Sequence, residues 1–343
     1  MQNKKIVTLG EIMLRLAPPG YSRFTQADTF GATYGGGEAN VAVSLANFGL
    51  EAAFVTKLPA NDIGQAAVNS LRKFGVDTHH IVRGGARVGI YYLEKGANQR
   101  PSKVVYDRAG SSIATAKPED FDWDAIFADV DWFHFTGITP AISPDAASVC
   151  LAALKAAKDK GITTSCDLNY RKNLWSKAQA GETMATLMPY VDLCIANEED
   201  AADVFGIHSA ATDVTAGELN HDGYIDVAQQ LVARFGFKYV AITLRESFSA
   251  SHNDWGGLLY DGKQAHFSKK YSIKNIVDRV GGGDSFGAGL IYGMLTERGT
   301  QGALEFAVAA SCLKHSIEGD FNMVSVAEVQ ALAGGDASGR VQR

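Results

Sequence analysis

Residues 278–289 read DRVGGGDSFGAG, three consecutive glycines that run into an aspartate at the predicted start of a helix. A helix N-terminus carries unpaired N–H groups and partial positive charge, so it attracts anions. Glycines just before it can present further backbone N–H groups to an anion. In a simpler interpretation Asp284 is only the N-cap, and Gly287 and Gly289 allow close helix packing. A simple cap does not require three flexible glycines, which favours an anion site beside Asp284.

The composition is that of a soluble globular protein, with 46% hydrophobic and 20% charged residues in a chain of 343. Charged residues recur throughout, so no stretch has the unbroken apolar length that a membrane helix needs. The N-terminal stretch MQNKKIVTLGEIML superficially resembles a secretory signal, but its apolar part is short and Glu11 interrupts it. We therefore expect residues 5–10 to form a first buried strand, and no membrane partner.

The charge and the cysteine spacing narrow the class of protein further. A net charge of −6 without a dense basic run gives little support for a nucleic-acid partner. His134, inside WFHFTG, is expected to be a core histidine rather than a metal ligand. Four cysteines lie far apart without a CxxC pair, which predicts buried free thiols in a reducing compartment: Cys150, Cys166, Cys194 and Cys312. These features together indicate a cytoplasmic protein.

Apolar strand-like runs alternate with helical patterns along most of the chain. Such alternation predicts crossover units and a mostly parallel sheet with helices on both faces, and ligands at the carboxyl ends of the strands. The expected strands are 5–10, 52–57, 131–137, 162–168, 191–196 and 238–244. The expected helices are 38–48, 62–74, 144–160, 177–188, 223–235, 284–297, 301–317 and 325–332.

Two segments, at about 14–35 and 87–108, lack the helical period. The second alternates, so that Tyr91 and Leu93 share one strand face while Tyr92 faces the other side. The pattern predicts a small antiparallel sheet inserted into the α/β core as a lid. Because such a sheet exposes an apolar face, we expect a homo-oligomer, either a dimer formed through the lid or a higher oligomer.

The remaining segments predict connections rather than further domains. Residues 256–271 are expected to form a hairpin with Asp261-Gly262 as its turn. The polar insert 207–222 is expected to be a surface loop, and the Gly- and Ser-rich tail 334–343 is expected to be flexible. The chain is therefore expected to be a single domain over residues 1–333, with the lid as its insertion.

A second glycine run, GGGEANVAVSLANFG at residues 35–49, also opens a predicted helix, with Asn40 one turn in. Taken alone it indicates either a turn or a close backbone approach to a polyhydroxylated ligand. Taken with DRVGGGDSFGAG near the other end, it resembles the two signatures of the ribokinase (PfkB) family of carbohydrate kinases. The resemblance implies a ribokinase-like three-layer α/β sandwich with a β-lid, and ATP- and Mg²⁺-dependent phosphorylation of a sugar hydroxyl.

The same resemblance assigns roles around the first motif. It implies that Asp284 accepts the proton of the sugar hydroxyl. The N–H groups of Gly281, Gly282 and Gly283, with the helix dipole, would stabilise charge on the transferred phosphoryl group. The chain departs from the family at Arg279, where Thr, Pro or Ser is usual. The resemblance also suggests a monovalent cation such as K⁺ near this loop. Because position 279 shapes the loop before the anion hole, the arginine there would change the details of such a cation site.

The phrases FTGITPAIS, YDRAGSS, DLNYRKNLW and TLRES are similar to the branch of the family that phosphorylates 2-keto-3-deoxygluconate, a sugar acid. The expected substrate-binding residues are Gly36, Gly37, Asn40, Tyr91, Tyr106, Arg108 and Arg171, beside Asp284. Two arginines converging on one pocket suit a carboxylate substrate, although a single arginine is more often a surface residue. A fructokinase, a ribokinase and a non-catalytic sugar-binding protein of the same fold are the alternatives.

The nucleotide site is also expected from the resemblance. The stretch NEED at 197–200 is similar to the family's N-x-x-E motif, with Asn197 toward phosphate and Asp200 toward magnesium, through water. Its simpler interpretation is an N-cap followed by acids that favour a first helical turn. Thr243 and Arg245 are expected to reach the ATP phosphates, and Ala307 and Ser311 to form a wall of the adenine pocket.

Overall fold

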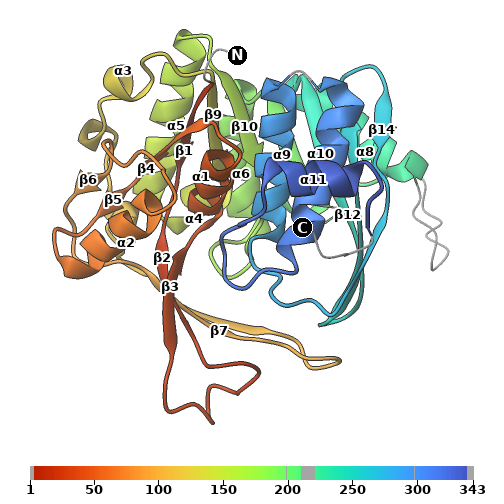
Figure 1. Ribbon diagram of the computed structural model, residues 1–343. Coiled ribbons are helices and arrows are strands. Elements are labelled where there is room, and N and C mark those ends of the chain that lie inside the picture. Colours follow the sequence, from red (N-terminus) through yellow and green to blue (C-terminus); the bar gives the residue numbers. More distant parts are fainter. Residues whose placement is uncertain (1–3, 198, 210–220, 297, 338–343) are drawn as a thin grey trace.

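The computed structural model describes residues 4–197, 199–209, 221–296 and 298–337 (Figure 1). The parallel strands of the central sheet are β1 (Lys5–Leu9), β4 (Glu51–Val55), β9 (Trp132–Thr136), β10 (Thr163–Asp167), β11 (Leu193–Asn197) and β12 (Tyr239–Ser249). Antiparallel strands extend it: β13 (His252–Tyr260), β14 (Ala265–Phe267) and β15 (Tyr271–Lys274). The order is β14-β13-β12-β11-β10-β9-β1-β4, with β15 pairing to β13, so the predicted mostly parallel sheet is confirmed.

Helices cover both faces of this sheet. One face packs against α1 (Gly37–Asn47), α2 (Asp62–Arg72), α9 (Gly282–Leu295), α10 (Gly299–Lys314) and α11 (Val326–Ala333). The other packs against α5 (Pro144–Asp159), α6 (Lys177–Leu187), α7 (Asp200–Phe205) and α8 (His221–Phe235). Because side chains alternate along a strand, Ile6 enters the first core and Val7 and Leu9 the second. The central strands are therefore apolar on both faces, and the three-layer architecture is confirmed.

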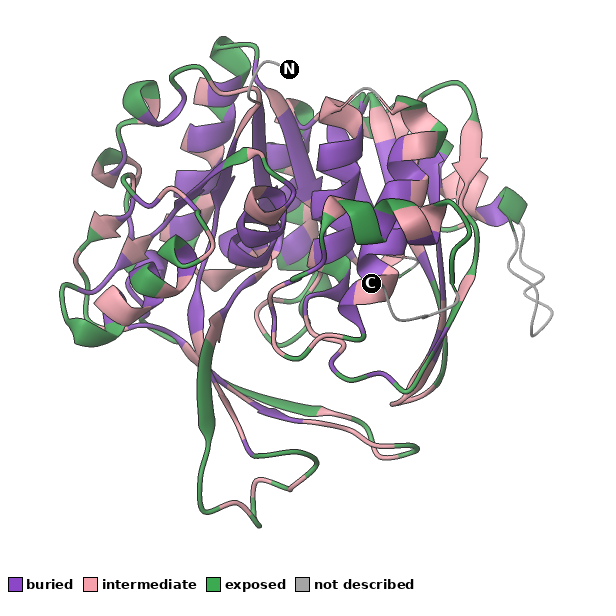
Figure 2. Cartoon of the chain, viewed as in Figure 1, coloured by how far each residue is buried: buried purple, intermediate pink, exposed green. Residues whose placement is uncertain are grey.

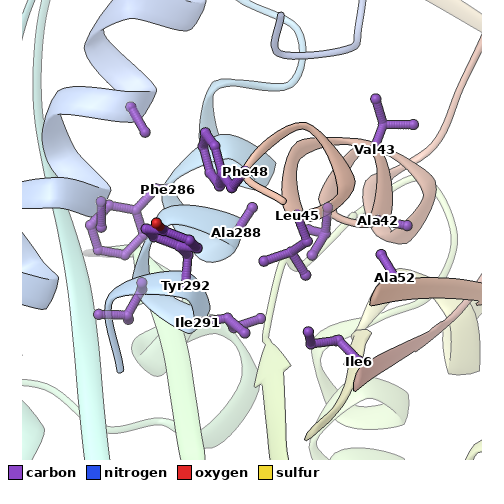
Figure 3. Close-up of a cluster of buried hydrophobic side chains, with 14 of the residues drawn as sticks. Ile6, Ala42, Val43, Leu45, Phe48, Ala52, Phe286, Ala288, Ile291 and Tyr292 are labelled. Carbon is purple, nitrogen blue, oxygen red and sulfur yellow. The ribbon is translucent and has the colours of Figure 1, made fainter. Parts of the chain in front are cut away.

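The helix that follows each glycine run packs against the other (Figure 3). Phe48, at the end of α1, lies against Tyr292 of α9, with ring centroids 5.2 Å apart. Behind α9, a Cβ added at Gly289 would lie 2.8 Å from the Cα of Ala307 on α10. Gly289 therefore allows the close packing of α9 and α10, and this core fixes where both motifs begin.

The lid is a separate sheet of four strands, β2 (Met13–Ala17), β3 (Gly31–Gly35), β7 (Ile90–Glu94) and β8 (Lys103–Asp107), in the order β3-β2-β7-β8. It projects from one edge of the core (Figure 1). The prediction of a wholly antiparallel lid is wrong, because β2 and β7 run parallel. Long crossovers through the core separate these two strands in the chain, and parallel pairing needs such connections.

The strands of the lid differ in burial (Figure 2). Tyr91 and Leu93 are buried, as the alternation predicts, and Tyr92 packs instead against Phe24 and Phe30 with ring centroids 6.5 and 6.2 Å apart. Every residue of β8 is exposed. The lid therefore presents an uncovered apolar strand at its edge.

Several boundaries differ from the sequence predictions. The strand β12 runs on to Ser249 and pairs with all of β13, so the expected hairpin 256–271 is part of a longer meander. Its predicted turn is confirmed: β13 and β14 pair around Asp261, whose carboxylate accepts the N–H of Lys263 and of Gln264. Sequence reasoning did not resolve the short helices α3 (Trp123–Ile126) and α4 (Ile138–Ile142), the helix α7, or the small pair β5 (Lys57–Leu58) and β6 (Val82–Arg83). Short turns Ile113–Thr115, Pro118–Asp120 and Met188–Tyr190 are 3₁₀ helices.

Most of the predicted surface loop and of the predicted flexible tail lies outside the described residues. Residues 210–220 of the expected surface loop and 338–343 of the expected tail are outside the described residues, and α8 already begins at His221. All four cysteines are free thiols, as predicted, although Cys312 is only half-buried. His134 is buried with its Nδ1 2.8 Å from Ser165 Oγ, which confirms a core histidine. Across the residues described, no helix is long and apolar enough to cross a membrane.

Candidate active site

A cleft of about 400 Å³ lies at the carboxyl ends of the parallel strands, between the core and the lid. A parallel sheet is expected to bind its ligand at this edge, and the volume suits a small molecule. Most of the residues predicted from the sequence line this cleft: Gly36, Gly37, Asn40, Tyr91, Tyr106, Arg108, Arg171, Asn197, Asp200, Thr243, Arg245, Gly281, Gly282, Gly283 and Asp284. Ala307 and Ser311 lie outside its lining.

We call the run Gly281–Gly283 the anion loop. Its first two positions can hold only glycine, because a Cβ atom there would clash with neighbouring residues. Gly281 has a φ of 83°, and a Cβ there would lie 2.2 Å from the backbone oxygen of Asp320. A Cβ at Gly282 would lie 2.8 Å from the His315 ring. Gly283 has open space around it, toward the cleft. Since α9 begins at Gly282, two residues before the predicted start, the loop brings the first-turn N–H groups of Gly283 and Asp284 to the cleft, while the Gly282 N–H donates to the Arg279 carbonyl at 3.3 Å.

Asp284 joins the two glycine runs. Asn40 of α1 donates its Nδ2 hydrogen to Asp284 Oδ2 at 2.7 Å, across 244 residues of sequence. A Cβ at Gly37 would lie 3.5 Å from Asp284 Oδ1, in ordinary contact. Burial raises the pKa of Asp284 to about 6, against the Asn40 hydrogen bond, which lowers it. Asp284 is therefore a carboxylate at neutral pH that binds a proton more readily than an exposed one.

Sequence reasoning missed Glu38, which anchors the first glycine run. Its Oε1 accepts hydrogen bonds from the Thr136 N–H at 2.9 Å, from Thr136 Oγ1 at 2.8 Å and from Thr139 Oγ1 at 2.6 Å. Burial raises the pKa of Glu38 to about 7. These bonds tie the start of α1 to the end of β9, and the sequence signal was an acid inside an otherwise apolar helix start.

The lid end of the cleft holds two tyrosines and an ion pair. Tyr91 donates its hydroxyl to Asp320 Oδ2 at 2.5 Å, and its ring lies 6.1 Å from that of Tyr106. Arg108 lies 5.5 Å from the Tyr106 ring centroid and donates Nε–H to Glu11 Oε2 at 2.7 Å. Glu11 is 4% exposed, and its Oε1 has no hydrogen-bond partner among the described residues. The charge of Arg108 is thus already neutralised by Glu11, a cleft residue that sequence reasoning did not identify.

The opposite wall, after β10, carries an arginine that forms no ion pair with the described residues. Arg171 is exposed, lines the cleft and donates Nη1–H to the Tyr170 carbonyl at 3.1 Å. It faces a carboxylate group that sequence reasoning also missed, Asp167 at the end of β10. Burial raises the pKa of Asp167 well above its ordinary value, Asp200 and Asp284 add to the rise, and Arg171 opposes it. A cation at this wall would relieve the repulsion among these carboxylates.

The expected nucleotide end of the cleft holds Asn197, at the end of β11, and Asp200, at the start of α7. Asn197 Oδ1 accepts the N–H of Glu199 at 2.8 Å and of Asp200 at 2.9 Å, which is the capping arrangement. The carboxylate of Asp200 accepts the N–H of Tyr170 and of Asn197, each at 3.2 Å. Both oxygens of Asp200 therefore already accept a backbone hydrogen bond. This arrangement is compatible with the expected contact to magnesium through a water molecule.

The two residues expected to form a wall of the adenine pocket lie in the core, outside the cleft lining. Ala307 and Ser311 are fully buried on α10, and Ser311 donates its hydroxyl to the Gly282 carbonyl at 2.6 Å. Ser311 therefore supports the anion loop from behind. Arg279 donates Nη2–H to the carbonyls of Ser249 at 3.1 Å and Ala250 at 2.7 Å, which holds the tip of the β12–β13 hairpin near the loop.

The donor set fits one type of metal site. Among residues 4–197, 199–209, 221–296 and 298–337, no group of three or more His, Cys, Asp or Glu side chains could hold an ion by itself. Mg²⁺ keeps several waters and needs only one or two carboxylates besides phosphate oxygens. Asp200 and Asp167 fit that requirement.

Comparison with known proteins identifies the family. Residues 3–324 match the model of the pfkB family of carbohydrate kinases. The chain belongs to this family. The crystal structure of 2-dehydro-3-deoxygluconokinase from Thermotoga maritima superposes with a TM-score of 0.93 at 53% identity, over 97% of this chain and 100% of that one. The family and the α/β ribokinase-like fold predicted from the sequence are thus confirmed.

Two curated pfkB relatives cover most of the chain. The 2-dehydro-3-deoxygalactonokinase of Haloferax volcanii is 34% identical over 334 residues, 97% of this chain and 98% of its own length. The 2-dehydro-3-deoxygluconokinase of Bacillus subtilis is 26% identical over 318 residues, 92% of this chain and 91% of its own. This pfkB chain is therefore similar over nearly its whole length to a 2-dehydro-3-deoxygalactonokinase and a 2-dehydro-3-deoxygluconokinase.

Proposed function

We propose that this pfkB kinase transfers the γ-phosphoryl group of ATP to the 6-hydroxyl of 2-keto-3-deoxygluconate. The observation that carries the proposal is the meeting of Asp284, the Gly281–Gly283 loop and Arg171 in one cleft. A base, an anion site and a free cation in that arrangement suit phosphorylation of a hydroxyl on an anionic sugar. The names of the sugar-acid kinases to which the chain is similar support the same substrate.

Asp284 accepts the proton of the attacking hydroxyl. Its oxygen is oriented by Asn40, and orientation matters more than basicity in a loose transition state. The N–H groups at the start of α9 and the helix dipole stabilise charge that develops on the phosphoryl oxygens. Mg²⁺ bound with ATP would neutralise further phosphate charge, with Asp200 holding one of its waters.

The remaining cleft residues divide between the two substrates. Asn197, Thr243 and Arg245 lie toward the phosphates of ATP. The sugar contacts Gly36, Gly37, Asn40, Tyr91 and Tyr106, and the lid closes over it, since excluding water prevents wasteful hydrolysis of ATP. Because Glu11 neutralises Arg108, Arg171 pairs with the substrate carboxylate, and Arg108 donates to a neutral oxygen of the sugar.

A second candidate substrate is 2-keto-3-deoxygalactonate, which the 34% identical relative favours by its name. A neutral-sugar kinase, such as a fructokinase or ribokinase, would have no use for the free charge of Arg171. A non-catalytic sugar-binding protein would have no use for a base beside an anion site.

The assembly we propose is a homodimer through the lid, in a cytoplasmic enzyme. Its support is the apolar edge strand β8, where Val104, Val105 and Tyr106 are 42%, 52% and 42% exposed. A second copy pairing with this strand would cover that surface. Light scattering of the purified protein tests it, and a monomer at micromolar concentration would contradict it.

The experiment that tests the function is ATP turnover with magnesium on 2-keto-3-deoxygluconate, 2-keto-3-deoxygalactonate, fructose and ribose. We expect a sugar acid to be preferred and Arg171→Ala to lose about tenfold or more in kcat/KM for it, the loss of a charge-assisted pair. Lys172→Ala is the matched control, because Lys172 is exposed beside Arg171 and outside the cleft lining. Preference for a neutral sugar, or equal losses in both variants, would contradict the proposed substrate.

A further inference from the structure

A cluster of buried charges lies behind the anion loop, outside the groups already given a chemical role. It contains two cations and two carboxylates from separate elements: Arg15 of the lid strand β2, Lys314 at the end of α10, Asp278 before the loop and Asp320 after α10. Lys314 is fully buried, and the side chains of Arg15, Asp278 and Asp320 are 2%, 2% and 3% exposed. Charges buried to this degree are costly unless they are paired.

The carboxylate oxygens of the cluster already accept hydrogen bonds. Arg15 donates Nη2–H to Asp278 Oδ2 at 2.6 Å and Nη1–H to Asp320 Oδ1 at 2.7 Å. Asp278 Oδ1 accepts the Val280 N–H at 3.1 Å, and Oδ2 also accepts the Gly319 N–H at 3.2 Å. Asp320 Oδ2 accepts the hydroxyl of Tyr91. The cluster therefore joins the lid strands to the loop that precedes Gly281.

The side chain of Lys314 is the part of this cluster that approaches Gly281 from α10. Its Nζ donates to the Ile317 carbonyl at 3.1 Å, and its Cε lies 3.3 Å from the position of a Cβ at Gly281. Burial lowers the pKa of Lys314, and the charges of Asp278 and Asp320 oppose this. The end of the Lys314 side chain thus lies beside the first glycine of the anion loop.

These contacts do not fit a monovalent cation at the loop, which resemblance to the family suggested. Such an ion would need carboxylate and carbonyl oxygens beside residues 278–280. The Asp278, Asp320 and Ile317 oxygens there already accept from Arg15, Lys314, Tyr91 and backbone N–H groups. The two carboxylates of the cluster are also already matched by its two cations, so an added ion would find no unpaired carboxylate in this cluster.

We propose that Lys314, held in place with Arg15, is a built-in counter-cation that supports the anion loop and makes turnover independent of potassium. A fixed positive charge behind the loop adds to the field of the N–H groups at the point where phosphoryl charge develops. Lys314 does not contact the reacting atoms, so it is a positioning residue that acts through Gly281 and Asp284. This role does not depend on which sugar is phosphorylated.

Lys314 also acts on the base. The groups whose charge or hydrogen bond reaches the Asp284 carboxylate are the amide of Asn40, the carboxylates of Asp320 and Asp167, the guanidinium of Arg171 and the ammonium of Lys314. Of these, Lys314 and Arg171 lower the pKa of Asp284, as does the Asn40 hydrogen bond. Removing the Lys314 charge should therefore move the acidic limb of the pH profile of kcat/KM to higher pH.

The first arm of the test needs no variant. Turnover of the wild-type protein, with whichever sugar it accepts, and its unfolding temperature are measured in potassium chloride and in tetramethylammonium chloride of equal ionic strength. We expect turnover in the two salts to agree within about twofold, and no stabilisation by potassium, since an ion that binds only the folded state would raise the unfolding temperature. Stimulation of several-fold, or potassium-dependent stabilisation, would overturn the proposal.

The second arm compares Lys314→Met with Lys57→Met. Lys57 is the matched control because its ammonium group also forms a sheltered pair, with Asp120 at 2.7 Å, but away from the cleft. We expect Lys314→Met to lower kcat by about tenfold or more and to move the acidic limb up, while Lys57→Met does neither. An unmoved limb in a folded Lys314→Met protein, whatever its kcat, would overturn the proposal, because a purely structural lysine has no reason to change the titration of Asp284. If the wild type uses none of the four sugars, the proposed substrate fails while the unfolding measurements still test the potassium claim.

Discussion

Replacing Asp284 with Asn should remove most of the activity and make the protein more stable. The side chain keeps its size and can still pair with Asn40, but it can no longer accept a proton. General-base catalysis contributes about 10²–10⁴ in rate, so turnover should fall by that factor. The gain in stability follows from burial, because an amide carries no charge to desolvate.

The size of that gain follows from the shift in the carboxyl pKa from 3.8 to about 6. Between these values the folded protein holds a proton that the unfolded chain has released, so the free energy of unfolding falls as pH rises through this window. Above about pH 6 the charged carboxylate destabilises the folded protein by at most about 3 kcal/mol, the free energy of a pKa shift of about two. This value is an upper limit because the half-buried side chain faces the cleft. The Asn variant should therefore be more stable at about pH 8, and the difference should vanish toward pH 4.

Two assays on the same preparations check both halves of the prediction. ADP release with the preferred sugar gives the activity, and urea unfolding at about pH 8 and about pH 4 gives the stability. Asp62→Asn is the control, because Asp62 is also an acid in the first turn of a helix but is exposed and outside the cleft lining. It should keep full activity and lose up to about 1 kcal/mol. An Asp284→Asn protein with more than about a tenth of the wild-type turnover, or less stable than wild type at pH 8, would refute the reasoning.

Two further substitutions probe the new cleft assignments. Glu11→Gln leaves the buried Arg108 without its counter-charge and should raise KM for the sugar by about tenfold, with KM for ATP unchanged. Glu94→Gln is the control, because it weakens the similar ion pair with Arg100 in the lid and should leave both KM values unchanged. Equal effects of the two substitutions would indicate a general defect of the lid and contradict the prediction. Ser311→Ala removes the bond to the Gly282 carbonyl and should lower kcat and cost about 1 kcal/mol of stability, whereas a change in KM for ATP alone would return Ser311 to the adenine wall.

The sequence determined the layered core and the position of the two glycine runs. Mostly apolar runs such as 131–137 and 191–196 alternate with helical patterns, so the layered parallel sheet, with strands buried on both faces, followed from the order of these segments along the chain. The two glycine runs, with Asn40 and Asp284, could also be recognised from the sequence. Close backbone approach at the start of a helix needs glycine, independently of the rest of the chain. A local pattern thus sufficed wherever a local constraint decided the structure.

Tertiary structure alone decided which charges meet. Arg15 pairs with Asp278, which is 263 positions away in the sequence, and with Asp320, which is 305 positions away. Glu11 and Arg108 are 97 positions apart, so no local spacing in the sequence predicts any of these pairs. The inward position of Ser311 was hidden for a related reason: α10 is buried on nearly every side, and its sequence gives no polar face from which to orient it. Ion pairing depends on distance in space and on exclusion of water, and both arise only when separate elements pack together.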